Sequence, residues 1–295
     1  MRLELVWQVA LPGAQRRTAY RAAVCADGTL YALDSRGTIS AVKATGDLAF
    51  TTTHPDVVGM TAVACASTGE LLVWNGHDVV TLLPGETGEL DLVDRQPFAG
   101  HVFRVVPAAE ATLALALDEQ GRGQIVRFSA SGTEEVTRLE ATRDPQAVVD
   151  GMIVYDSDSR RIGYVPGGQY QLHSFDEHGR LVALYPRADP SFRSLPSPAG
   201  LMPASPAPRD RVIAVHALPD GNLLTQVTRF SGAGSSEVRP QVVMEILDER
   251  FNLLATVEDY LGRLQGVSTD GSVFLTDIRL PAGRAVRARL TAAGD

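Results

Sequence analysis

Arginines recur just before or within short apolar segments, and this placement is the clearest chemical pattern in the chain. Five arginines share it: Arg21, Arg104, Arg143, Arg211 and Arg263. A planar guanidinium offers paired donors that suit carboxylate or phosphate groups. If these side chains converge, they form a basic site for an anionic ligand. The alternative is that each arginine pairs with a neighbouring aspartate or caps loop carbonyl groups.

Three of the six histidines, His54, His101 and His216, stand at comparable places in different segments. Together they could hold a soft metal ion or exchange protons with a substrate, whereas scattered histidines are simply packed or solvated. The sequence contains no Gly-x-Ser-x-Gly elbow, no glycine-rich phosphate loop and no His-x-x-x-His run. We therefore expect no catalytic residue, metal or cofactor, and take the three histidines as candidate ligand-binding residues.

Cys25 and Cys65 are the only cysteines. They stand three and four residues before the turn glycines Gly28 and Gly69. Because side chains alternate along a strand, this offset predicts that the two cysteines point to opposite faces of neighbouring strands. We expect two buried small residues; a disulfide or a shared metal ion is the alternative.

The segments that position these residues repeat along the chain. Residues 22–50 consist of short apolar strands separated by turn signals such as Asp27-Gly28. Corresponding turn positions recur at Gly28, Gly69, Glu110 and Gly151, which are 41 residues apart, and then at Asp220-Gly221 and Asp270-Gly271. A period near 40 built from short strands predicts an all-β propeller of six four-stranded antiparallel blades. In the fourth unit, residues 146–149 are the expected inner strand and 152–155 the second strand.

The two ends of the chain complement each other. The last unit supplies three strands, at 263–268, 272–277 and 285–290, and then stops one strand short. Residues 3–10 form an unassigned strand that could pair with the last one and remove an exposed edge. We therefore expect residues 1–11 to close the ring and residues 1–295 to form one domain.

Residues 186–211 differ in composition from the rest, because seven prolines interrupt them among serines and alanines. Such a segment lacks the donors and the apolar periodicity of a strand, so we expect a long loop. Two roles remain open for this loop: a lid or docking site for a partner, or a plain surface insertion.

Composition narrows the class of protein. The chain of 295 residues is 44% apolar and carries a net charge of −8, which disfavours nucleic acid as a partner. It contains no run of 18 apolar residues that would predict a transmembrane helix, and its first residues lack a signal-peptide core. We expect a cytoplasmic protein or a mature exported form.

Three segments carry a resemblance to known proteins: DGTLYALDSRGTISAVKATGDL at 27–48, QLHSFDEHGRLVALY at 171–185 and MEILDERFNLLATVED at 244–259. They resemble blades of six-bladed propellers of the NHL and TolB-like type. The first unit is also similar to quinoprotein-like repeats, which carry Trp where this chain has Phe50. The resemblance implies a binding or scaffold module, or an enzyme such as a metal-dependent lactonase or lyase. Lactonase-like members hold a divalent cation with Glu, Asn and Asp, which the expected inner strands lack.

The combined prediction is a non-catalytic binding or scaffold propeller. It would recognise a protein partner or a small, possibly anionic ligand at the mouth of the central channel. The alternative is a propeller hydrolase or lyase that uses a histidine at the mouth or a bound divalent metal.

Overall fold

The computed structural model describes residues 1–11, 21–34, 36–66, 68–85, 87–108, 111–129, 132–139, 145–187, 189, 192, 210–231, 239–257, 262–277 and 284–292. Arg143 and most of the predicted loop at 186–211 lie outside the described residues.

The strands of the described residues form six four-stranded antiparallel sheets, which we number as blades 1 to 6. The first three blades contain these strands: β2 (Arg21–Val24), β3 (Leu30–Leu33), β4 (Thr38–Val42) and β5 (Leu48–Thr53); β6 (Ala62–Cys65), β7 (Leu71–Trp74), β8 (Asp78–Pro84) and β9 (Leu90–Pro97); β10 (His101–Ala108), β11 (Ala111–Leu117), β12 (Gly123–Ser129) and β13 (Gly132–Arg138).

The last three blades repeat the same meander. They contain these strands: β14 (Met152–Asp156), β15 (Arg161–Val165), β16 (Gln171–Phe175) and β17 (Leu181–Pro186); β18 (Arg211–Ala217), β19 (Leu223–Ser231), β20 (Arg239–Leu247) and β21 (Leu253–Val257); β22 (Arg263–Val267), β23 (Val273–Asp277), β24 (Arg284–Thr291) and β1 (Arg2–Ala10). Two short helices, η1 (Pro55–Val57) and α1 (Pro145–Val149), lie between blades. No described helix is long and apolar enough to cross a membrane.

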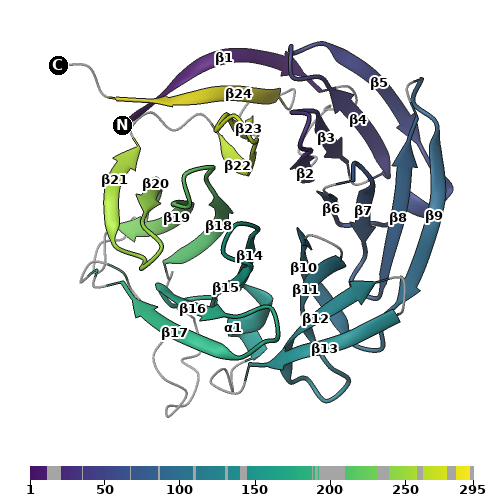
Figure 1. The fold of residues 1–295 in the computed structure, drawn as a ribbon. Coiled ribbons are helices and arrows are strands. Elements are labelled where there is room, and N and C mark those ends of the chain that lie inside the picture. Colours follow the sequence, from purple (N-terminus) through teal and green to yellow (C-terminus); the bar gives the residue numbers. More distant parts are fainter. Residues whose placement is uncertain are drawn as a thin grey trace.

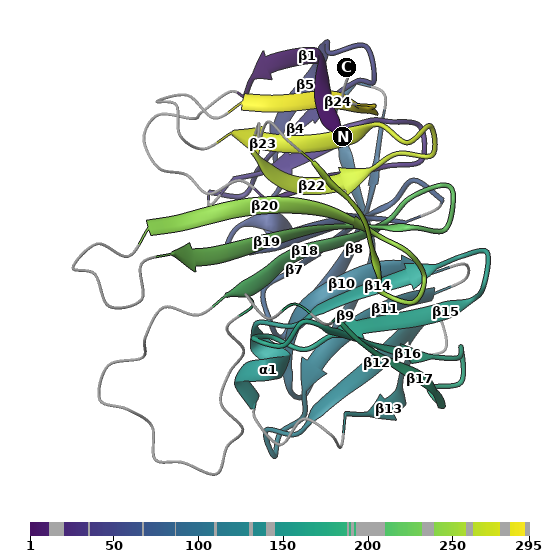
Figure 2. The ribbon, with the colours of Figure 1, turned by 90° about the vertical axis from the view of Figure 1, so that its left-hand side faces the viewer.

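The six blades form a closed ring around a central channel (Figure 1). The first strand of each blade faces the channel, and the fourth lies at the periphery. A view from the side shows the strands running across the thickness of the ring (Figure 2). Because every blade repeats one meander, the inner strands run in the same direction along the channel. The predicted six-bladed β-propeller is thus confirmed.

The apolar core lies between the blades rather than at the centre of the ring. Six clusters of buried side chains each join two neighbouring blades, as when Ala23 of blade 1 packs with Val63 of blade 2. Each inner strand is therefore covered on both faces, which explains why these strands read as nearly continuous apolar runs.

The turn chemistry expected at Asp27-Gly28 is present. Gly28 has a φ of +80°, a conformation that glycine adopts without a clash. The Thr29 amide donates to Asp27 Oδ1 at 2.9 Å, and the Cys25 amide donates to the Thr29 carbonyl at 2.9 Å. These bonds close the five-residue turn, residues 25–29, between β2 and β3.

The N-terminal strand closes the ring as predicted. Arg2 to Ala10 pair antiparallel with Thr291 to Arg284, so β1 becomes the fourth strand of blade 6. The register shifts between Leu5 and Trp7, and each other blade has such a shift between its third and fourth strands. Trp7 Nε1 also donates to the Ala44 carbonyl of blade 1 at 2.9 Å. The segment thus behaves as a true blade strand and ties the last blade to the first.

In the fourth unit, the prediction of which segments form the inner and second strands was wrong. Residues 146–149 lie in helix α1, and Met152–Asp156 form the inner strand rather than the second one. The helix is fixed by its contacts: Tyr164 Oη donates to the Ala147 carbonyl at 2.9 Å, and Val148 is fully buried. Two apolar runs follow each other in this unit, and the spacing alone did not show which one is the strand.

Candidate functional site: the central channel

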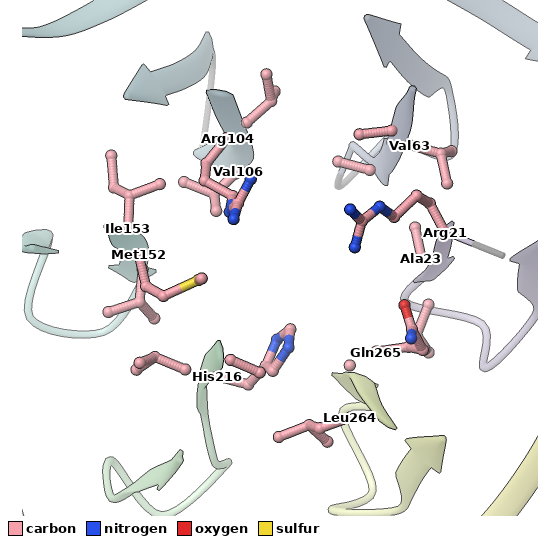
Figure 3. Close-up of a pocket in the computed structure, with 18 of the residues that line it drawn as sticks. Arg21, Ala23, Val63, Arg104, Val106, Met152, Ile153, His216, Leu264 and Gln265 are labelled. Carbon is pink, nitrogen blue, oxygen red and sulfur yellow. The ribbon is translucent and has the colours of Figure 1, made fainter. Parts of the chain in front are cut away.

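The central channel contains a cavity of about 350 Å³ to which all six inner strands contribute (Figure 3). This volume lies within the range of about 300–1,000 Å³ that small-molecule sites occupy. Most of the lining side chains are apolar, and none of the described lining residues is aspartate or glutamate. The polar side chains that enter the cavity therefore decide what it can bind.

Arg21 is the first residue of β2, and its guanidinium points into the channel (Figure 3). Burial lowers the pKa of Arg21, and no neighbouring charge opposes this shift. Within the described residues, no acceptor pairs with its guanidinium. The group remains a cation at neutral pH, because arginine loses its proton only in strong base.

Arg104 reaches the same cavity from blade 3 (Figure 3). The register of β10 with β11 shifts between Val102 and Arg104, leaving Phe103 as an extra residue. Such a bulge re-aims the side chains that follow it. Arg104 Nη1 donates to the Phe103 carbonyl at 2.8 Å. Burial lowers the pKa of Arg104, the charge of Arg21 lowers it further, and Asp150 opposes both. We call Arg21 and Arg104 the channel arginines.

His216 of β18 also projects into the channel (Figure 3). The ring touches channel solvent, yet protein surrounds it, and burial lowers the pKa of His216 to about 4. At neutral pH the imidazole is therefore uncharged and offers one donor and one acceptor.

Gln265 is the extra residue of a bulge in β22, where the register shifts between Leu264 and Gly266. Its Oε1 accepts the Ala22 amide of blade 1 at 3.1 Å, and its Nε2 donates to Thr276 Oγ1 at 2.8 Å. The side chain lines the cavity and also joins the last blade to the first. Sequence reasoning did not select it, although a lone amide within an apolar inner strand is a usable signal.

The structure brings four of the predicted residues to the cavity: Arg21, Arg104, His216 and Arg263. The other described candidates, His54, His101 and Arg211, do not line it. His54 caps η1, where its Nδ1 accepts the Asp56 amide at 3.2 Å. The His101 ring packs against Phe103 and His77, with centroid distances of 4.6 and 5.1 Å. Arg211 is exposed, with Nη1 3.7 Å from Asp150 Oδ1.

The three histidines therefore do not form a cluster, because only His216 lines the cavity. Among the described residues, no three His, Cys, Asp or Glu side chains are arranged to hold a metal ion. Arg211 is not among the residues that line the cavity, so it lies outside the expected ring of arginines. The register of β18 with β19 shifts just after it, between Val212 and Ala214.

Cys25 and Cys65 form a disulfide, which corrects the expectation of two separate thiols. Their Cα atoms are 5.2 Å apart, and the bond joins blade 1 to blade 2 beside the channel. The two cysteines do point to opposite faces of neighbouring strands, as predicted, but this does not keep them apart. Cys25 faces blade 2 and Cys65 faces blade 1; in a ring, these opposite faces of neighbouring blades are the ones that meet.

A second set of buried charges lies between blades 4 and 5. Glu245 of β20 is almost fully buried and accepts from Arg229 Nη2 at 2.8 Å and from the Tyr170 hydroxyl. Arg187 Nε lies 3.3 Å from Glu245 Oε2, and Arg229 Nη2 donates to Asp189 Oδ2 at 2.6 Å. We call Arg187 and Arg229 the interface arginines, and two carboxylates match their charges.

The pKa shift of Arg229 reflects this pairing. Burial lowers the pKa, but the carboxylates of Asp189 and Glu245 outweigh burial and raise it above its usual value. The shift is opposite to those of the channel arginines. Sequence reasoning missed this network, although a carboxylate inside the apolar run of β20 signals a buried partner.

The sequence matches no known family profile, and no curated protein is similar to it in sequence. Solved structures with the same fold include a gluconolactonase from Xanthomonas campestris, with 12% identity, TM-score 0.58, and 98% of this chain and 95% of that chain covered. Virginiamycin B lyase from Staphylococcus aureus gives 11% identity, TM-score 0.57, and coverage of 98% and 100%. BamB from Moraxella catarrhalis gives 12%, 0.52, and 98% and 100%. At these identities the likeness establishes the propeller fold alone, and the NHL or TolB-like type stays a prediction.

Proposed function

We propose that the protein is a non-catalytic binding propeller whose central channel holds a small anionic ligand between Arg21 and Arg104. One observation carries this proposal: two guanidinium groups from different blades enter a cavity whose described lining contains no carboxylate. Their pKa values are lowered by burial and, for Arg104, by the other arginine. An anion between them would offset both costs through charge-assisted hydrogen bonds.

The alternative, a hydrolase or lyase, would use His216 as the base, since it is the predicted histidine that lines the cavity. A general base works best when its pKa lies near the working pH. The pKa of His216, about 4, makes the ring a weak base at neutral pH. We therefore favour binding; hydrolysis of a lactone or ester that is lost in His216→Gln would reverse this preference. Recognition of a protein partner at the channel mouth stays a prediction.

Isothermal titration calorimetry with butyrate, glutarate and inorganic phosphate tests the proposal. We expect at least one anion to bind with a stoichiometry of one and to lose about tenfold or more in affinity in Arg21→Gln/Arg104→Gln, because charge-assisted hydrogen bonds are lost. Arg250→Gln is the matched control, since that side chain is 71% exposed. Absence of binding by these three anions and by the longer carboxylates hexanoate and octanoate, or equal affinity in the double variant, would overturn the proposal.

A further inference from the structure

The channel arginines enter the cavity from two blades, whereas most of the remaining wall is apolar. Arg21 and Arg104 come from blades 1 and 3, and Val63 of blade 2 lies between them around the ring (Figure 3). Blade 4, which follows blade 3 around the ring and lies opposite blade 1, contributes Met152 and Ile153. A ligand held between the two guanidinium groups and long enough to cross the cavity therefore also reaches hydrocarbon.

The cationic side suits a single carboxylate. Two guanidinium groups that repel each other can share one anion, because each carboxylate oxygen accepts from a separate fork of donors. His216 adds no positive charge at neutral pH, since burial keeps its ring neutral. Asp150 offsets part of the charge of Arg104, and Arg263, which also lines the cavity, already has a partner, so a single carboxylate suits the charge that the channel arginines leave over.

The apolar side would reject a second charge. A charged or strongly polar group placed against Met152 and Ile153 would lose water without gaining a hydrogen bond. Hydrocarbon placed there gains free energy with each methylene that leaves water. Met152 is unbranched and adapts its shape, so this wall can accept tails of different form.

From the two guanidinium groups and the apolar wall that the cavity presents together, we propose that the ligand is a monocarboxylate with an apolar body. It is small enough for a cavity of about 350 Å³. The inference rests on the proposed function, because it names the chemical class that the same channel selects. The carboxylate lies between Arg21 and Arg104, and the apolar body extends toward Met152 and Ile153.

Calorimetry with a homologous series of carboxylates tests separately whether the channel binds an anion and whether it selects an apolar body. Butyrate, hexanoate and octanoate carry the same carboxylate and differ only in apolar length. We expect affinity to rise roughly fourfold for each added methylene, the gain from burying one such group, until the cavity is full. Octanol and octylamine should bind at least tenfold more weakly than octanoate, roughly the cost of one lost charge-assisted bond.

Two variants assign the parts of the ligand. Arg21→Gln/Arg104→Gln should reduce octanoate binding to the level of octanol. Met152→Gln, which keeps the length of the side chain, should flatten the gain in affinity with chain length, so that octanoate loses more affinity than butyrate. Unfolding midpoints equal to that of the parent protein show that each variant is folded.

The outcomes are distinguishable. If no anion of the series binds, and glutarate and phosphate do not bind either, the proposed function itself fails. If anions bind but octanoate is no better than butyrate, or glutarate or phosphate binds more tightly than octanoate, the anion site stands and the monocarboxylate inference is overturned. Undiminished octanoate binding in the arginine double variant would also overturn it.

Discussion

Two pairs of partly buried arginines in this propeller have opposite electrostatic surroundings. The interface arginines, Arg187 and Arg229, contact the carboxylates of Glu245 and Asp189 between blades 4 and 5. The channel arginines have no such carboxylate in the cavity they enter. The chain itself neutralises the first pair, so we assign it a structural role. At the second pair, Asp150 offsets only part of the charge of Arg104, and we propose that this pair binds an anion. The two pairs differ in the pairing of their charges rather than in their burial, and under the proposed function this pairing separates structural arginines from ligand-binding ones.

The largest effect is expected from breaking the interface pair. Glu245→Ala leaves two buried guanidinium groups without their shared carboxylate, and removing one partner of a buried ion pair costs about 3–5 kcal/mol. Glu249→Ala should change stability by less than about 0.5 kcal/mol, because that side chain is exposed. Urea unfolding measures both free energies.

Glu245→Gln sharpens this test. It keeps the shape of the side chain and an acceptor for the Tyr170 hydroxyl, so its cost should fall between those of the parent and the alanine variant. A Glu245→Ala variant as stable as the parent would show that the interface arginines do not depend on their carboxylates. The proposed distinction between the two pairs would then fail.

A second effect is expected from reducing the disulfide between Cys25 and Cys65, which lies beside the channel. Cys25 follows β2, the strand that begins with Arg21, and its bond to Cys65 fixes this strand against blade 2. Reduction should lower the free energy of unfolding by about 2–4 kcal/mol, because it frees a loop in the unfolded chain. It should also weaken anion binding.

Urea unfolding with and without dithiothreitol measures the effect, and Cys25→Ser/Cys65→Ser should be insensitive to the reductant. Equal stability of the reduced and oxidised protein would contradict the brace. Because disulfides persist mainly in oxidising compartments, the bond favours such a compartment over the cytoplasm.

Much of the fold could be predicted because a four-stranded meander is local. Turn pairs such as Asp27-Gly28 mark its strands, and their recurrence gives the number of blades. What could not be predicted depends on contacts between distant segments. The bulges at Phe103 and Gln265 change which side chains enter the channel, and the sequence pattern does not show where the register shifts. Similarly, Arg187 and Glu245 are 58 positions apart, and neither segment indicates that the other is its partner.

A third, smaller effect involves the titration of His216. The unfolded chain takes up a proton near the usual pKa of 6.5, whereas the folded ring resists protonation until about pH 4. The unfolded state therefore binds more protons in this interval, and the free energy of unfolding falls as pH falls from about 6.5 to 4. Water in the channel screens the ring and reduces this loss.

His216→Gln should remove this share of the acid destabilisation while leaving the share of His173, whose pKa burial also lowers. Urea unfolding at several pH values between 4 and 7 compares the two slopes. Identical slopes in variant and parent would mean that the ring is freely solvated, and that the channel is more polar at this depth than its lining indicates.

The smallest effect on the free energy of unfolding is expected from replacing the channel arginines, whose replacement should affect anion binding most. Arg21→Gln/Arg104→Gln removes two like charges whose pKa values burial already lowers, so its cost should stay below the roughly 1 kcal/mol of an average substitution, or become a gain. Residues kept for binding rather than for folding commonly behave in this way. Urea unfolding in low-salt buffer without added carboxylate measures the difference, with Arg250→Gln as the control. A loss above 2 kcal/mol would mean that the channel arginines, like the interface pair, hold the ring together, and the contrast between the two regions would then disappear.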